Sequence, residues 1–237
     1  MRPPNSFIDR EALGAGALAR KTAAVLEAWH PGARDAEAIA SILLGRTNPS
    51  GRLPLSFPAS LDDLPRRTVE GARWTSIALG RPKTEAVSVD YDIEGSDVGY
   101  RWYARSGKRP LFAFGHGLTY KSFAYEGLRL SGGAKVAASF TVRNTGAREG
   151  ADVPQLYLTN AAGRPRLRLA AFDKIALKPG ESREVNLTVE PRILADWDAA
   201  AGAWRIAAGD YTFALGAAAD DLKASAQVRL PPQRLKP

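Results

Sequence analysis

The chain has 237 residues, enough for one large domain or two modest ones, each with its own hydrophobic core. Hydrophobic residues make up 45% and charged residues 24%, as in ordinary globular proteins, and no stretch approaches 18 consecutive apolar residues, which excludes a membrane-spanning helix. Cysteine is absent, which excludes disulfides, thiolate catalysis and cysteine-bound metal. The first residues, MRPPNSFIDREALG, lack the apolar core of a signal peptide, so we expect no export signal in this chain and leave its location open.

The net charge of +8 suggests an acidic partner such as a nucleic acid. The arginines are scattered, however, and no RNA-binding or zinc-finger signature accompanies them. The one local cluster, GRPRLRL (163–169), alternates basic with apolar residues, which predicts the exposed face of a strand. We therefore predict neither a nucleic-acid partner nor a membrane partner.

The first third of the chain predicts short regular elements. Residues 18–29 (LARKTAAVLEAW) fit a helix, but AAVLEAW fits a short buried strand equally well, and HPG (30–32) ends either one. ARDAEAIASILLG (33–45) predicts an amphipathic helix that ends at Gly45. RTNPSGRLPLSFP (46–58) contains three prolines and a glycine, which predicts a turn and an extended segment.

Residues 59–110 have weak periodicity and many charges, which predicts a long excursion over a surface. Within it, DVGYRWYA (97–104) predicts one strand or turn. The acidic stretch DYDIEGSD (90–97) offers carboxylates for a catalytic pair, but we favour a solvated loop that leads into the aromatic block.

After Gly117 the pattern changes to short alternating runs separated by turn sequences such as SGG, NTG and KPGE. Seven runs follow this pattern: SFAYEGLRL, KVAASFTVRN, ADVPQLYLT, RLRLAAFDKIAL, SREVNLTVE, GDYTFALGA and ASAQVRL. Seven strands at this spacing predict an antiparallel β-sandwich of the immunoglobulin or fibronectin type III kind. VEPRILADWD (189–198) predicts a helical turn between strands, and we expect Trp197 and Trp204 to fill the sandwich.

Six stretches together resemble the C-terminal part of glycoside hydrolase family 3, the β-glucosidase and β-xylosidase family. They lie in the family's order and cover most of the chain after Ala17: 25–58, VGYRWY (98–103), PLFAFGHGLTYKSFAY (110–125), VRNTGAREGADVPQLYL (142–158), FDKIALKPGESREVNLTV (172–189) and WRIAAGDYTFALG (204–216).

The resemblance implies a mainly β chain, in which a fibronectin type III-like β-sandwich follows a strand–helix remnant of an α/β sandwich domain. We expect the remnant at 1–58, a linker or docking segment at 59–117 and the β-sandwich at 118–237. Retaining glycoside hydrolysis needs two carboxyl groups about 5–5.5 Å apart. In this family the nucleophile lies on a preceding (β/α)8 barrel and the acid/base glutamate lies well upstream of AWHPG, so the resemblance assigns no catalytic residue here.

Candidate substrate contacts follow the first predicted strand, because loops at strand ends of α/β sheets often face ligands. The candidates in AWHPGARD are Trp29, His30, Arg34 and Asp35. The alternative is a tight turn in which an acid complements a helix N-terminus. Arg101 and Trp102 are further candidates because aromatic faces bind sugars, although strand spacing would bury half of that block.

Other chemistry has little support in the sequence. With two histidines and no G-x-S-x-G motif, a serine hydrolase site is not indicated, and neither metal-ligand spacing nor a glycine-rich phosphate loop is present. We predict no cofactor and no metal. FAFGHGLTYKSF (112–123) contains His116, yet we interpret it as a seam between domains, with Gly115 and Gly117 allowing a turn and Phe112, Phe114 and Tyr120 packing the joint.

Three functional hypotheses remain. The first is the C-terminal part of a family 3 β-glycosidase that supports a catalytic barrel rather than acting alone. The second is a stand-alone module that binds a β-glucoside, an oligosaccharide or a protein, and the third is weak ester or glycoside hydrolysis. Because a lone strand–helix unit leaves an apolar face open, we expect a barrel in trans or self-association through residues 17–58.

Overall fold

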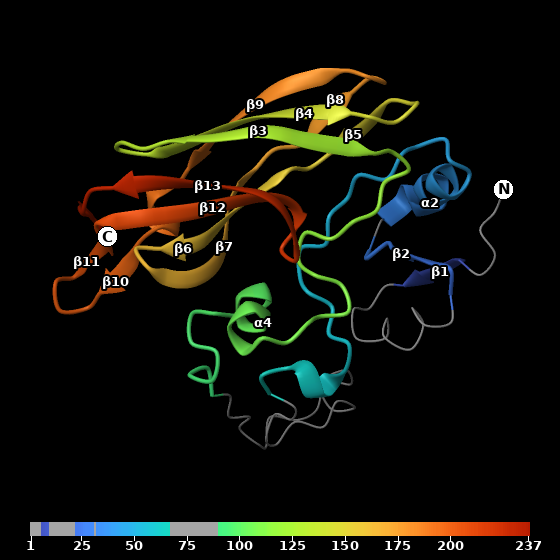
Figure 1. Ribbon diagram of the computed structural model, residues 1–237. Helices are drawn as coiled ribbons and strands as arrows, with labels where there is room; N and C mark the ends of the chain where they lie inside the picture. The colour runs from blue at the N-terminus through green and yellow to red at the C-terminus, as the bar shows by residue number, and fades with distance from the viewer. Residues whose placement is uncertain (1–5, 10–21, 31, 67–89) are drawn as a thin grey trace, which may run out of the picture.

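The computed structural model describes residues 6–9, 22–30, 32–66 and 90–237 (Figure 1). A β-sandwich forms the C-terminal half, a small α/β unit lies beside one end of it, and a short helix lies below it in the view of Figure 1. The predicted mainly β fold is therefore confirmed. Among the described residues no helix has the length and hydropathy needed to cross a bilayer.

Two antiparallel sheets face each other in the sandwich. The first has the order β3-β4-β9, with bounds Phe123–Ser131, Val136–Asn144 and Ser182–Val189. The second has the order β13-β12-β6-β7, with bounds Asp221–Leu230, Gly209–Ala218, Gln155–Ala161 and Arg164–Phe172.

Smaller strand groups extend the sandwich. One is the antiparallel pair of β5 (Gly150–Asp152) and β8 (Ile175–Leu177). The other has the order β10-β11-β14, with bounds Asp196–Asp198, Ala203–Ile206 and Gln233–Leu235.

All seven predicted runs contain strands, but two of them are interrupted. ADVPQLYLT divides into β5 and β6 around Pro154, which has no N–H to donate to a neighbouring strand. RLRLAAFDKIAL divides into β7 and β8 around residues 173–174. The predicted helical turn is present as the 3-10 helix η3, Pro191–Ile193.

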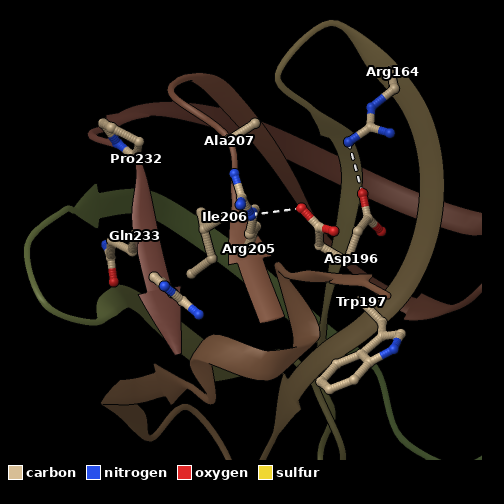
Figure 2. A pocket seen from close by; sticks show the side chains of 10 residues that line it. Arg164, Asp196, Trp197, Arg205, Ile206, Ala207, Pro232 and Gln233 are labelled. Atoms are coloured by element: carbon tan, nitrogen blue, oxygen red, sulfur yellow. Dashed lines mark hydrogen bonds and ion pairs between the residues drawn. The ribbon is translucent and has the colours of Figure 1, made fainter. Parts of the chain in front are cut away.

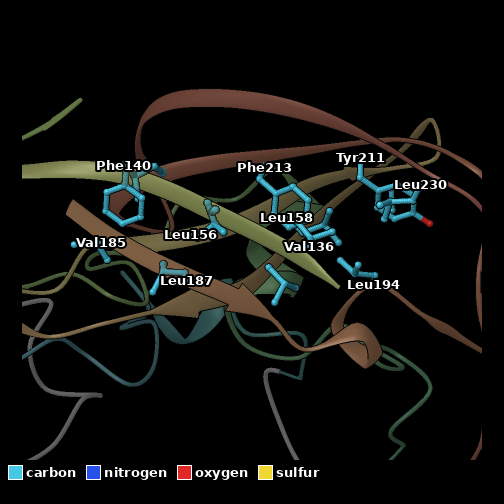
Figure 3. Close-up of a cluster of buried hydrophobic side chains, with 14 of the residues drawn as sticks. Val136, Phe140, Leu156, Leu158, Val185, Leu187, Leu194, Tyr211, Phe213 and Leu230 are labelled. Carbon is cyan, nitrogen blue, oxygen red and sulfur yellow. The ribbon is translucent and has the colours of Figure 1, made fainter. Parts of the chain in front are cut away.

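The core lies between the two sheets, where side chains from both sheets meet (Figure 3). On β4 Val136, Ala138, Phe140 and Val142 are at most 2% exposed, while the residues that alternate with them, 137, 139 and 141, are exposed or half-buried. Phe213 and Leu215 of β12 meet them from the facing sheet. Each such buried side chain contributes about 1.5–3 kcal/mol relative to an exposed one, so alternation alone specifies the register.

The expectation that two tryptophans fill the sandwich is half right. Trp204 on β11 packs against the core cluster. Trp197 is 48% exposed, because the alternation of the short strand β10 turns it outward. Its ring meets that of Trp204 edge-on, with 5.4 Å between the centroids.

The N-terminal unit contains two parallel strands, where we expected only one. The short-strand interpretation is right for β2 (Ala24–Glu27), while residues 18–21 lie outside the described part. β1 (Ser6–Asp9) pairs with it in parallel and was not predicted. The 3-10 helix η1 (Gly32–Arg34) leads into α2 (Asp35–Leu43), which confirms the predicted helix.

The strand or turn predicted for DVGYRWYA is wrong, because α4 (Tyr100–Ser106) is helical. Gly99 and Gly107 bracket it with φ of 61° and 68°, the left-handed region that glycine adopts freely. Helical spacing places Tyr100 and Tyr103 on one face: Tyr103 is buried, and the Leu169 N–H donates to the Tyr100 hydroxyl at 2.8 Å. This packing against β7 overrides the β propensity of the aromatic residues.

The segment 111–120 is a seam, as predicted, and it pairs with the extended segment 51–57. Phe57 and Phe112 form a β-bridge, and the N–H groups of Leu53 and Gly115 bond to carbonyls across the pair at 2.8 Å. Another 3-10 helix, η2 (Leu61–Asp63), follows Phe57. These hydrogen bonds cross the predicted division at residue 58, and the Ala219 N–H crosses the one at 117 by donating to the Phe114 carbonyl at 2.9 Å. Both boundaries stay predictions.

Gly115 and Gly117 of the seam are each required to be glycine, but for different physical reasons. Gly115 has a φ of 80°, and the buried Gln155 amide donates to its carbonyl at 3.1 Å. Gly117 has no left-handed backbone, but a Cβ there would overlap the carbonyl of Gly51. The third expected packing residue, Tyr120, is 53% exposed, and its hydroxyl donates to the Ile42 carbonyl at 2.9 Å.

Candidate functional site

The loop after β2 carries four predicted contact residues. Trp29 is half-buried, meets the Phe57 ring edge-on and has a φ of 49°, a conformation that costs a residue with a Cβ about 1–2 kcal/mol. His30 is exposed, and the exposed Arg34 pairs with Glu37 at 3.2 Å. The Asp35 carboxylate accepts the Ala36 N–H at 2.6 Å at the start of α2, as the alternative interpretation expects.

The other two predicted contact residues lie apart from that loop, on α4. The Arg105 guanidinium covers the Trp102 ring at 5.3 Å from its centroid, so one face of the expected sugar platform is occupied. Arg101 lies over the Tyr100 ring at 5.9 Å and donates to the Ser96 carbonyl at 3.5 Å. The six candidates therefore lie on two separate elements, the loop after β2 and α4.

A cavity of about 580 Å³ lies beside Trp197, and Figure 2 shows this ring at its rim. The Arg205 guanidinium pairs with Asp198 at 2.8 Å on the cavity wall, and Gln233 of β14 borders the opposite side. An exposed indole next to paired charges and an amide provides both an apolar surface and hydrogen-bond partners. The sequence pattern does not reveal this site, because it predicts that Trp197 fills the core.

A second cavity of about 590 Å³ lies between α4 and β7. We call it the arginine cavity, because its lining contains Arg101, Arg105, Arg164, Arg166 and Arg168. Asp97 and Asp196 are its acidic residues.

Asp196 organises the arginines of β7. Its carboxylate accepts two hydrogen bonds from Arg166, at 2.5 and 2.7 Å, and one from Arg164 at 2.7 Å. Burial opposes ionisation of this group, but the hydrogen bonds and charges of these arginines outweigh it and hold the pKa of Asp196 below its ordinary value. Arg168 donates to the carbonyls of Ile193 and Ala195 at 3.0 and 3.2 Å.

The prediction that GRPRLRL forms an exposed strand face is therefore only partly right. The strand is present, but the side chains of Arg166 and Arg168 are 17% and 14% exposed. The spacing of three arginines at alternate positions shows that they share one face of β7. It does not reveal Asp196, which comes from a distant strand that covers them.

The buried carboxylates of the described residues each face an arginine. Arg52 pairs with Asp152, which also accepts the Tyr125 hydroxyl at 2.6 Å, and burial together with this carboxylate raises the pKa of Tyr125. Glu94 pairs with Arg66, so the expected solvated loop is wrong for this residue, which is 7% exposed. Paired buried charges of this kind hold segments together.

The described residues contain no group of three or more histidine, aspartate or glutamate side chains placed to hold a metal ion. His116 stacks on the Phe112 ring at 5.3 Å, and burial lowers its pKa despite the opposing charge of Asp220. It packs the seam, which agrees with the structural interpretation of FAFGHGLTYKSF.

Comparisons with known proteins agree with this architecture. The family model of the glycosyl hydrolase family 3 C-terminal domain matches residues 11–120, and that of the fibronectin type III-like domain matches residues 152–219. β-Glucosidase B of Emericella nidulans is 36% identical over 92% of this chain, and a β-glucosidase of Rhizobium radiobacter is 38% identical over 89%.

Solved structures give the same result. The structure of β-glucosidase 3B from Thermotoga neapolitana in complex with glucose matches 93% of this chain with a TM-score of 0.78 and 32% identity. That match covers 30% of the solved chain, and the chain spans 26% of the length of each of the two curated relatives. The chain therefore belongs to glycoside hydrolase family 3, of whose β-glucosidases it represents the C-terminal part.

Proposed function

We propose that this chain supports and completes the catalytic part of a β-glucosidase-type glycoside hydrolase and does not hydrolyse glycosides alone. The observation that carries the proposal is the exposed apolar surface on its α/β unit. α2 has no buried residue, and Leu44 at its end is 63% exposed. A helix of an α/β domain normally buries one face against a sheet, which here has two described strands.

The seam continues this apolar surface. The bond from the Tyr120 hydroxyl to the Ile42 carbonyl holds the Tyr120 side chain beside the end of α2. Leu118 is 75% exposed and Tyr120 53%. We call Leu44, Leu118 and Tyr120 the Leu44 patch. Neighbouring exposed apolar side chains mark surfaces that bind other protein segments, and the resemblance to longer β-glucosidases favours their catalytic part as the occupant.

The test is a chimera in which this chain replaces the matching C-terminal part of the Rhizobium radiobacter β-glucosidase. We expect hydrolysis of nitrophenyl β-glucoside well above that of the same enzyme lacking its C-terminal part, and none by this chain alone. Leu44→Asp should reduce the activity of the chimera about 10-fold or more, because it places a charge where assembly with the catalytic part would bury a leucine. Val98→Asp, at a residue 56% exposed outside the patch, should leave it unchanged.

Three results would contradict the proposal. One is a folded chimera no more active than the truncated enzyme. Another is an equal loss of chimera activity in Leu44→Asp and Val98→Asp. The third is turnover of nitrophenyl glycosides or esters by this chain alone. Stable dimers of this chain that Leu44→Asp dissociates would instead assign the patch to self-association.

A second function, glycan binding, has support from the Trp197 cavity. Trp197 is 48% exposed, whereas the Arg105 guanidinium lies over the Trp102 ring. Calorimetry with cellobiose should give binding that Trp197→Ala abolishes. Loss of cellobiose binding in Trp102→Ala alone would assign the sugar site to Trp102 instead.

A further inference from the structure

The arginine cavity contains more positive charge than the structure neutralises. Five arginines and two aspartates line it. Asp196 is already shared by Arg164, Arg166 and, at 3.7 Å, Arg168. Within the described part of the chain, Asp97 forms an ion pair with Arg105, at 3.4 Å, and with no other arginine.

Burial makes this excess costly. The side chains of Arg166 and Arg168 are less than a fifth exposed, so water screens their charges poorly. Burial first, and then the neighbouring charges of Arg166 and Arg101, lower the pKa of Arg168. Guanidinium groups remain protonated in proteins, so this repulsion persists unless a further anion enters the cavity.

Arg101 is the cation best placed to bind such an anion. It forms no ion pair within the described part of the chain, and its one hydrogen bond, to the Ser96 carbonyl, is long at 3.5 Å. It lies on α4, across the cavity from the arginines of β7. A ligand between the two elements would therefore meet guanidinium groups from both sides.

We propose that the arginine cavity is a binding site for a small anion that carries a carboxylate or phosphate group. The planar guanidinium fork matches both groups in a bidentate geometry. The volume of about 590 Å³ lies within the range of small-molecule sites and exceeds the space a bare ion needs. Thr159 of β6 also lines the cavity, but its hydroxyl donates to the Thr212 carbonyl at 3.2 Å, so the arginines supply the hydrogen-bond donors. The proposal does not depend on assembly with a catalytic domain.

Calorimetry on the whole chain at constant ionic strength tests it with four probes: glucuronate, glucose 6-phosphate, inorganic phosphate and glucose. We expect saturable one-to-one binding of at least one anion and none of glucose. Preference for glucuronate assigns a carboxylate ligand, and preference for the two phosphates assigns a phosphate ligand. Arg101→Gln should weaken binding about 10- to 100-fold, because it removes a charge-assisted contact, and Arg101→Lys should weaken it less.

Arg143→Gln is the matched control, since it removes one exposed arginine from β4 in the other sheet. It should leave the affinity unchanged. The proposal is overturned if no anion saturates the chain, or if Arg101→Gln and Arg143→Gln reduce affinity equally. Thermal melts of the variants show whether each is folded, and a folded Arg101→Gln with unchanged affinity also overturns the proposal.

Discussion

Gly115→Ala should destabilise the chain far more than the same substitution at another glycine with positive φ. The φ of 80° places the residue in the left-handed region, where a Cβ costs about 1–2 kcal/mol. A Cβ would also lie 2.8 Å from both the amide carbon and the nitrogen of Gln155. Gln155 is 3% exposed, and its amide cannot move without losing its partners.

Those partners determine the size of the effect. The Gln155 amide donates to the carbonyls of Gly115 and Ala217, at 3.1 and 2.6 Å, and accepts the Tyr157 hydroxyl at 2.6 Å. Each buried polar group left unsatisfied costs about 1–3 kcal/mol. Losing one of these bonds together with the backbone strain gives about 2–5 kcal/mol, a large part of the stability of a typical domain.

Gly180→Ala is the matched control. Its φ is 72°, but a Cβ there would meet nothing within 4 Å, so only the backbone cost of about 1–2 kcal/mol applies. Urea unfolding followed by tryptophan fluorescence measures both variants, and the two free energies of unfolding should differ by about 1–3 kcal/mol, or roughly 0.5–1 M in the urea midpoint. Equal losses for the two variants would refute the role given to Gln155.

Three further substitutions test other contacts. Asp152→Asn should cost about 3–5 kcal/mol in urea unfolding, because it leaves the charge of Arg52 buried without its partner. His116 should make stability fall as the pH drops from 7 to 5: burial lowers its folded pKa below 6.5, so the stability it adds is complete above 6.5 and is lost as pH falls through the folded pKa. Melting temperatures against pH should flatten in His116→Gln, and an unchanged slope would contradict this. Tyr100→Phe removes the oxygen that accepts the Leu169 N–H and should cost about 1–3 kcal/mol by urea unfolding, whereas a neutral result would show that α4 does not depend on this bond.

The sandwich could be predicted because its signal is local. The alternation from Val136 to Val142 follows directly from the period of a strand, and the turn sequences between runs mark the ends. α4 could not be predicted in the same way. Its aromatic residues favour a strand by propensity, and only packing of Tyr100 and Tyr103 between distant segments makes the helix the better solution.

The candidate sites show the same difference between local sequence patterns and contacts between distant segments. The alternation of Arg164, Arg166 and Arg168 is visible in the sequence, and it correctly indicates a shared strand face. The cavity also needs Asp196 and Arg101, which lie about 30 and 60 residues away along the chain and reach β7 only in the folded structure. The prediction that Trp197 is buried was wrong for a different reason. A strand of three residues is too short for its alternation to show which face is inward.

The bridge between Phe57 and Phe112 has a consequence for how this chain tolerates changes in length. The stretch of chain between Phe57 and Phe112 begins and ends at this bridge, so the bridge fixes the distance between its two ends. The entropy of closing such a loop changes slowly, by about 0.6 kcal/mol for each doubling of its length. Additions or deletions there should leave the two faces of the seam in register, provided that the stretch holding α4 against β7 is kept.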